Sequence, residues 1–219
     1  MKVLIVEDID SISIGIQKTI QEFSNTEIVH AKYCDDAFLK YKRAVIDNEP
    51  FDLIITDLSF KSDYNEGVLK NGDDLIEAVR KIDKQTPIIV YSIEDKTFII
   101  KNLFEIFNIN AYVLKGRNST KELIDAIKST FKDEKFISKE LNHVLQKRNT
   151  IEIEEYDILL LYRLANGNSQ TEISIEFEKE KISPSSVSAI EKRINKLKIQ
   201  FQAKNTIQLI VLAKDLGII

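Results

Sequence analysis

The sequence predicts an α/β domain built on a parallel sheet, followed by a small all-helical domain. Short apolar runs alternate with amphipathic helical stretches in the first part of the chain, as in a parallel sheet covered by helices. From residue 152 onward the spacing of apolar residues is helical throughout. We therefore expect an α/β domain at 1–131, a partly helical linker at 132–150 and a helical domain at 151–219.

Five apolar runs predict the strands of the sheet. A short apolar run is typical of a strand that is buried on both faces. The runs are Lys2–Val6, Glu27–Ala31, Leu53–Thr56, Pro87–Tyr91 and Ala111–Leu114. Because helical stretches separate them, we expect a five-stranded parallel sheet in the flavodoxin-like order 2-1-3-4-5.

Polar side chains follow four of these runs directly. Glu7 and Asp8 follow the first run, Asp57 the third, Ser92 the fourth and Lys115 the fifth. The carboxyl ends of parallel strands meet at one edge of a sheet, where open α/β folds carry their chemistry. We therefore expect three acids, a hydroxyl and a lysine to gather at this edge.

This set of side chains is suited to phosphoryl transfer. Three neighbouring carboxylates repel one another unless a cation lies among them. Hard oxygen ligands favour Mg²⁺, which usually binds a phosphate as well. A lysine and a hydroxyl can hold the remaining phosphoryl oxygens. The chemistry indicated is in-line transfer of a phosphoryl group onto the carboxylate of Asp57.

The five positions, each at the end of an apolar run, resemble those of the receiver domain of bacterial two-component response regulators. The resemblance covers roughly residues 1–130. It implies that Asp57 is the phosphoacceptor, and that Asp8, Asp57 and the backbone carbonyl of Ser59 ligate Mg²⁺ while Glu7 acts mainly through water. Two alternatives stay open: single acids after strands are often turn formers or helix caps, and a degenerate receiver keeps the fold without being phosphorylated.

The resemblance also implies a switch. Ser92 takes the threonine or serine position of the family, Lys115 its lysine position and Tyr112 its aromatic switch position. In receivers the hydroxyl moves toward the phosphoryl group and the aromatic ring swings into the vacated space. Such a change is a two-state equilibrium biased by the new charge. An ordinary core aromatic is the other interpretation of Tyr112.

The segment after Asp57 departs from the family pattern. Lys61 stands where receivers usually have a proline, and the loop at 58–71 is several residues longer than usual. Long loops are often functional, so we weigh a role in tuning phosphate access equally against a solvated insertion.

Composition excludes several other kinds of site. Cys34 is the only cysteine, so neither an internal disulfide nor a cysteine zinc site is expected. His30 and His143 are the only histidines, which argues against a histidine-based site. The sequence shows neither a signal peptide nor an apolar run of the roughly 18 residues that span a bilayer. We expect a cytoplasmic protein with no membrane association.

The helical domain resembles the LuxR/NarL-type helix-turn-helix output domain. The stretch Asn166–Ile173 resembles the opening of the first helix of that motif, and Ser183–Val187 resembles the entry to its recognition helix. Two departures weaken the resemblance. The turn between these helices is about three residues longer than usual, and the domain begins with the acidic residues Glu152, Glu154 and Glu155.

Charge gives mixed evidence for DNA binding. Residues 151–219 hold nine Lys and Arg against ten Asp and Glu, a net charge of −1, whereas nucleic-acid-binding domains are usually basic. Residues 185–200 alone carry a net charge of +3. Hydroxyl and basic side chains at the start of a helix can contact phosphates and base edges. The candidate DNA-contacting residues are Ser185, Ser186, Ser188, Lys192, Arg193, Asn195 and Lys196.

These resemblances imply a response regulator that a sensor histidine kinase phosphorylates on Asp57 with Mg²⁺. It is a phosphoacceptor rather than an enzyme acting on other substrates, and it would bind promoter DNA as a homodimer. One alternative is a signalling adaptor whose helical domain docks a protein. A phosphatase of the aspartyl-phosphate kind is less favoured, because the second domain offers no further acid cluster or cap.

Overall fold

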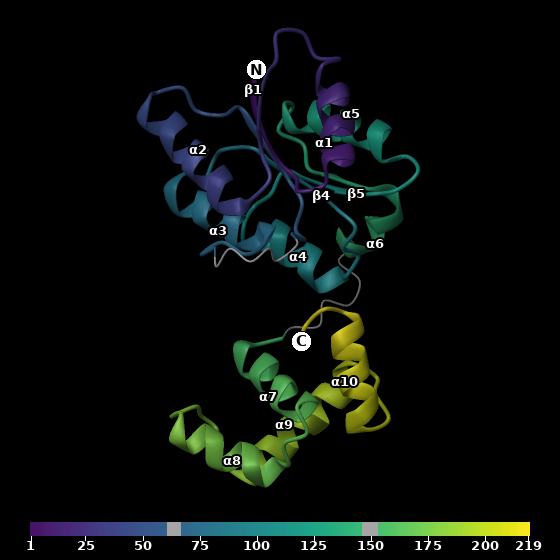
Figure 1. Cartoon of the computed structure of the whole chain (residues 1–219). Helices are drawn as coiled ribbons and strands as arrows, with labels where there is room; N and C mark the ends of the chain where they lie inside the picture. The colour runs from purple at the N-terminus through teal and green to yellow at the C-terminus, as the bar shows by residue number, and fades with distance from the viewer. Residues whose placement is uncertain (61–66, 146–152) are drawn as a thin grey trace. The chain divides into compact units, whose positions relative to one another are not determined.

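The structure, a computed structural model, describes residues 1–60, 67–145 and 153–219 (Figure 1). The chain divides into two compact units: Met1–Asp95 with Ile100–Leu145, and Lys96–Ile99 with Gln146–Ile219. Part of the long loop predicted at 58–71, including Lys61, and part of the predicted linker lie outside the described residues.

The first unit is an α/β fold with a six-stranded parallel sheet in the order β2-β1-β3-β4-β5-β6. Its strands are β1 (Lys2–Val6), β2 (Glu27–Ala31), β3 (Leu53–Thr56), β4 (Ile88–Ser92), β5 (Ala111–Leu114) and β6 (Phe136–Ile137). Its helices are α1 (Asp10–Ile20), α2 (Cys34–Ile46), α3 (Gly72–Ile82), α4 (Thr97–Glu105, of which the part from Ile100 onward belongs to this unit), α5 (Ser119–Thr130) and α6 (Asn142–Leu145), with a 3₁₀ turn at Lys139–Leu141. The predicted order of the first five strands is confirmed.

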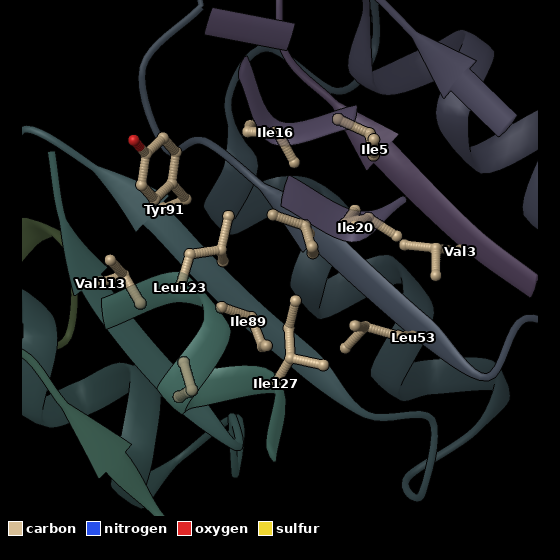
Figure 2. Close-up of a cluster of buried hydrophobic side chains, with 13 residues drawn as sticks. Val3, Ile5, Ile16, Ile20, Leu53, Ile89, Tyr91, Val113, Leu123 and Ile127 are labelled. Carbon is tan, nitrogen blue, oxygen red and sulfur yellow. The ribbon is translucent and has the colours of Figure 1, made fainter. Parts of the chain in front are cut away.

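The strands are apolar along their length because helices cover both faces of the sheet. Helices α1 and α5 pack together on one face, and α2 and α3 pack together on the other (Figure 1). Figure 2 shows the core under α1 and α5, where alternate strand residues meet the helices. The buried members are Val3, Ile5, Ile16, Ile20, Leu53, Ile55, Ile89, Tyr91, Ala111, Val113, Leu123, Ala126 and Ile127.

The prediction of a five-stranded sheet is corrected by β6, which lies in the segment predicted as a linker. Phe136 pairs with Ala111, and Ile137 pairs with Tyr112, so β6 covers the outer edge of β5. The amide of Ser138 donates to the carbonyl of Tyr112 at 2.9 Å. A two-residue strand is too short to show any periodicity in the sequence, which is why the pattern missed it.

The second unit consists of α7 (Glu155–Ala165), α8 (Gln170–Lys179), α9 (Val187–Gln200) and α10 (Thr206–Asp215) around a core of its own. Ser169 begins α8 with a capping box, in which its side chain and that of Glu172 each accept from the other's backbone amide. Ser186 caps α9 by accepting from the amide of Ala189 at 3.3 Å. The described residues include no helix with the length and apolar character needed to cross a bilayer.

Ser138 directly follows β6, and replacing it by alanine tests how much its side-chain hydrogen bonds contribute to stability. Its hydroxyl accepts from the amide of Leu114 at 2.9 Å and donates to Glu122, and the residue is 1% exposed. Loss of these bonds leaves buried groups unpaired and should lower the free energy of unfolding by about 1–3 kcal/mol. Urea denaturation of the full chain measures this change. If Ser138→Ala is as stable as a variant at the exposed Ser24, Ser24→Ala, the bonds contribute nothing.

Candidate phosphoacceptor site

The carboxyl ends of β1, β3 and β5 bring together two buried acids and a lysine. The ammonium Nζ of Lys115 lies 2.8 Å from Oε2 of Glu7 and 2.6 Å from Oδ2 of Asp57. Glu7 is fully buried, and Asp57 is 5% exposed. These residues are far apart in the sequence and meet because each follows a strand directly, as the sequence predicts.

Backbone amides fix the orientation of both carboxylates. Oδ1 of Asp57 accepts from the amides of Leu58 at 2.6 Å and Ser59 at 3.3 Å. Oε1 of Glu7 accepts from the amide of Ile9 at 3.3 Å. Each carboxylate therefore presents one oxygen to the backbone and the other to Lys115. Such pre-organised charges need little reorganisation during a reaction.

Burial and neighbouring charges shift the pKa values of Glu7 and Lys115 in this cluster. Burial raises the pKa of Glu7, and the nearby charge of Asp57 adds to this effect while Lys115 opposes it. Burial alone would lower the pKa of Lys115, but the hydrogen bonds to Asp57 and Glu7, together with the charges of these two acids, raise it. Lys115 is therefore a firmly protonated cation between its two acids at neutral pH.

The two predicted switch residues lie beside this cluster. Ser92 ends β4 and is fully buried, and its carbonyl accepts from the amide of Lys115 at 2.7 Å. Tyr112 on β5 is also fully buried, and its hydroxyl donates to the carbonyl of Glu94 at 2.7 Å. Burial raises the pKa of Tyr112, with the charge of Glu94 adding to it. The inward position of the ring, expected after phosphorylation, is already present in this structure.

The predicted metal ligands do not form a ready-made cage. Asp8 is half-buried next to Glu7, and Ser59 is exposed after Asp57. Within the described parts of the chain, no three His, Cys, Asp or Glu side chains gather closely enough to hold a metal ion. Glu7 and Asp57 both face Lys115, which bonds each of them.

The donor set itself still suits Mg²⁺. The edge carries three carboxylates and one ammonium, so a net charge of about −2 is left for a divalent cation to balance. The half-buried Asp8 adds a carboxylate beside the buried cluster. Oδ2 of Asp57 accepts from Lys115 alone among the hydrogen bonds of the described residues, so its second lone pair could ligate a cation.

Gly72 is a site residue that the sequence analysis did not identify. It begins α3, and its amide donates to the carbonyl of Leu58 at 2.9 Å. A Cβ at this position would lie 2.0 Å from the carbonyl oxygen of Asp57, so only glycine allows the helix to approach the acceptor so closely. The only sign of this role in the sequence is that a glycine directly follows the long loop predicted at 58–71.

In the second unit, most of the candidate DNA-contacting side chains lie on the surface. Ser186, Ser188, Lys192, Asn195 and Lys196 are exposed, and Ser185 is half-buried. Four of them, Ser188, Lys192, Asn195 and Lys196, belong to α9 itself, whose apolar residues Ile190, Ile194 and Leu197 face the core.

Arg193 differs from the other DNA-contact candidates because its guanidinium is paired within the unit, and its predicted role stays a prediction. Its Nη2 lies 2.7 Å from Oδ2 of Asp157, its Nε bonds Oδ1 of the same fully buried carboxylate, and Nη2 also lies 2.8 Å from Oε1 of Glu154. Hydrogen bonds to Asp157, and secondly to Glu154, raise the pKa of Arg193. The Arg193 side chain is 19% exposed, and its guanidinium is paired with Asp157 of α7 and with Glu154 at its start, which the one-dimensional charge pattern of α9 could not reveal.

Replacing Lys115 by methionine should destabilise the protein in a pH-dependent way. Two buried carboxylates would lose their counter-charge, and the free energy of unfolding should fall by about 3–5 kcal/mol at neutral pH. A raised pKa means that folded Glu7 holds its proton more tightly than the unfolded chain does. Stability should therefore recover as the pH falls through the raised pKa toward 4.5. Urea denaturation at several pH values measures both effects.

The double variant Lys115→Met/Asp57→Asn is the control. Removing one of the two acids as well should recover part of the lost stability. A loss for Lys115→Met that is the same at all pH values, or that Asp57→Asn does not reduce, would contradict this account of the cluster.

Comparison with known proteins connects this geometry to a fold. No family model and no curated protein matches the sequence. Among solved structures, RcsB of Salmonella typhimurium is 20% identical over 98% of this chain and 99% of that chain, with a TM-score of 0.69. RcsB of Salmonella enterica serovar Typhimurium, bound to a promoter in the presence of the phosphomimetic BeF₃⁻, is 20% identical over 98% of both chains, with a TM-score of 0.65.

The isolated REC domain of RcsB from Salmonella enterica serovar Typhimurium gives a partial match. It is 22% identical over 67% of this chain and 99% of that chain, with a TM-score of 0.54. RcsB is a two-component response regulator. The chain therefore shares the fold of RcsB over almost its whole length, including that of the REC domain.

Proposed function

We propose that this chain is a phosphorylation-controlled, DNA-binding response regulator whose phosphoacceptor is Asp57. The observation that carries the proposal is the Lys115 ammonium, 2.6 Å from Asp57 and 2.8 Å from Glu7 at the carboxyl edge of the sheet. The likeness in fold to RcsB, whose structures include complexes with DNA and with BeF₃⁻, supports both halves of it.

In the proposed reaction, a carboxylate oxygen of Asp57 attacks the phosphorus of a phosphohistidine on a sensor kinase. The new P–O bond forms in line with the breaking P–N bond, and the imidazole leaves. The amides of Leu58 and Ser59 hold the carboxylate in place. Lys115 then exchanges its contact with Asp57 for a phosphoryl oxygen, while the buried hydroxyl of Ser92 reorients toward the same group.

Mg²⁺ would be held by Asp8, by Asp57 and by the carbonyl of Ser59, with Glu7 acting through water, and it would neutralise charge on the phosphoryl oxygens. Lys115, which bonds both Glu7 and Asp57, would shift toward the phosphoryl group when that group and the metal ion enter the site. Exchange of Lys115 between partners is therefore part of the proposed activation, along with a shift in the equilibrium of Ser92 and Tyr112.

In the output domain, α9 is the proposed recognition helix. The side chains that remain for DNA are Ser185, Ser186, Ser188, Lys192, Asn195 and Lys196, without Arg193. We propose that the active form is a cytoplasmic homodimer that reads two half-sites of promoter DNA.

The second candidate is a signalling adaptor whose helical unit binds a protein. It is favoured by the net charge of −1 over residues 151–219 and by the internal pairing of Arg193, which removes one cation from the surface of α9. DNA binding driven by phosphate contacts must weaken steeply with salt, and this property separates the two candidates.

Fluorescence anisotropy of a labelled promoter fragment, across a salt series, tests the proposal. Adding BeF₃⁻ with Mg²⁺ should tighten binding by roughly tenfold, because the mimic biases the switch toward the active state. Asp57→Ala should abolish this response. Binding that ignores both the mimic and the salt concentration would reject the DNA-binding function and favour the adaptor.

Lys192→Ala and Arg193→Ala form a matched pair on neighbouring residues of α9. Lys192→Ala should leave the free energy of unfolding within about 0.5 kcal/mol while weakening DNA binding and lowering its salt slope by about one. Arg193→Ala leaves Asp157 buried without its counter-charge and should destabilise the protein by about 3–5 kcal/mol. Urea denaturation and anisotropy together test whether Lys192 serves DNA binding and Arg193 serves stability. An Arg193→Ala protein as stable as the wild type would contradict this assignment.

A further inference from the structure

The ring of Tyr91 lies beside the Lys115 ammonium. Nζ of Lys115 is 5.5 Å from the centroid of the ring, within the range of a cation–π contact. Tyr91 belongs to β4 and is 9% exposed, and its body packs in the core under α1 and α5 (Figure 2). The ring therefore belongs to the apolar core and offers its face to the cation.

The hydroxyl of Tyr91 is tied to the loop that follows Lys115. It lies 2.7 Å from Oγ of Ser119, and Oγ of Ser119 donates to the carbonyl of Gly116 at 2.8 Å. A carbonyl can only accept, so the proton of Ser119 is committed to Gly116 and Tyr91 must donate to Ser119. The hydrogen bonds run in one direction from Tyr91 to the residue directly after Lys115.

We propose that Tyr91 is a positioning residue for Lys115, with the ring holding the ammonium between Glu7 and Asp57 and the hydroxyl anchoring the Lys115–Ser119 loop. Its role in phosphoryl transfer rests on the proposed function, whereas its hold on Lys115 does not. A lysine side chain has four rotatable bonds and loses much rotamer freedom when it is fixed. The contact with the Tyr91 ring and the anchored Lys115–Ser119 loop limit the rotamers that the Lys115 side chain can adopt.

The consequence for the reaction is geometric. Lys115 has to stay near Asp57 while it exchanges a carboxylate oxygen for a phosphoryl oxygen, and a cation held by a π-face can make this exchange without returning to water. Tyr91 touches neither Asp57 nor the incoming group in this account. It acts through Lys115 alone.

Three variants separate the effect of the ring from that of the hydroxyl. Tyr91→Leu removes the ring and the hydroxyl, and Tyr91→Phe removes only the hydroxyl. Ser119→Ala removes the hydroxyl to which Tyr91 is bonded. Tyr41 provides the matched control, because it is also a buried tyrosine of the first unit whose hydroxyl lies 2.9 Å from a threonine hydroxyl, that of Thr86. Tyr41→Leu and Tyr41→Phe report what loss of such a residue does through stability alone.

The first readout is hydrogen exchange of the Lys115 ammonium, followed by NMR on the full chain without any phosphoryl donor. Tyr91→Leu should speed this exchange by roughly fivefold, Tyr91→Phe by less, and the Tyr41 variants should leave it unchanged. If the exchange in Tyr91→Leu equals that of the wild type, or if Tyr41→Leu speeds it as much, the positioning role is wrong.

The second readout is the rate at which acetyl phosphate with Mg²⁺ phosphorylates Asp57. Tyr91→Leu should slow it by roughly fivefold, and Tyr91→Phe and Ser119→Ala should have effects that do not add in the double variant, since both break the same chain of bonds. If Tyr91→Leu speeds hydrogen exchange of the Lys115 ammonium but leaves the phosphorylation rate of Asp57 unchanged, Tyr91 has no role in phosphoryl transfer. A wild-type chain that accepts no phosphoryl group, with the exchange effect intact, would reject the proposed function and leave the positioning of Lys115 standing.

Discussion

The first unit depends on one interaction, the contact of the Lys115 ammonium with two buried carboxylates. Ionised acids as buried as Glu7 and Asp57 would be strongly unfavourable without a cation between them. The parallel strands β1, β3 and β5 supply the three groups, and their pairing register fixes where each group emerges. The same contact is the centre of the candidate site, so the stability of the first unit and the geometry of that site arise from one arrangement.

The residues around the site restrict the positions of Asp57 and Lys115. Gly72 lets α3 approach the carbonyl of Asp57, the amides of Leu58 and Ser59 hold one carboxylate oxygen, and Tyr91 lies against Lys115. The amides of Leu58 and Ser59 bind Oδ1 of Asp57 and leave Oδ2 to Lys115, while Tyr91 contacts only the ammonium. Groups that position others without reacting are what keep a catalytic arrangement within its working geometry.

Sequence reasoning recovered what strand periodicity and strand ends encode. The five main strands, their order, and the meeting of Glu7, Asp57, Ser92 and Lys115 at one edge all follow from apolar runs that end in polar residues. It missed features that depend on three-dimensional partners. The strand β6 is too short to have a period, the need for glycine at Gly72 comes from a backbone in another segment, and the pairing of Arg193 with Asp157 joins two helices that look independent in sequence.

Strand β5 connects the site to the C-terminal end of the first unit. Lys115 follows its last residue, while Tyr112 within it contacts both sides: its hydroxyl bonds the carbonyl of Glu94, and its carbonyl accepts from Ser138 after β6. An outward swing of the Tyr112 ring breaks the first bond and leaves the second, a backbone bond, in place. Lys115 thus follows a strand whose other neighbour is β6, and the backbone pairing of β5 with β6 holds this strand in place while the ring of Tyr112 remains the part that can rotate.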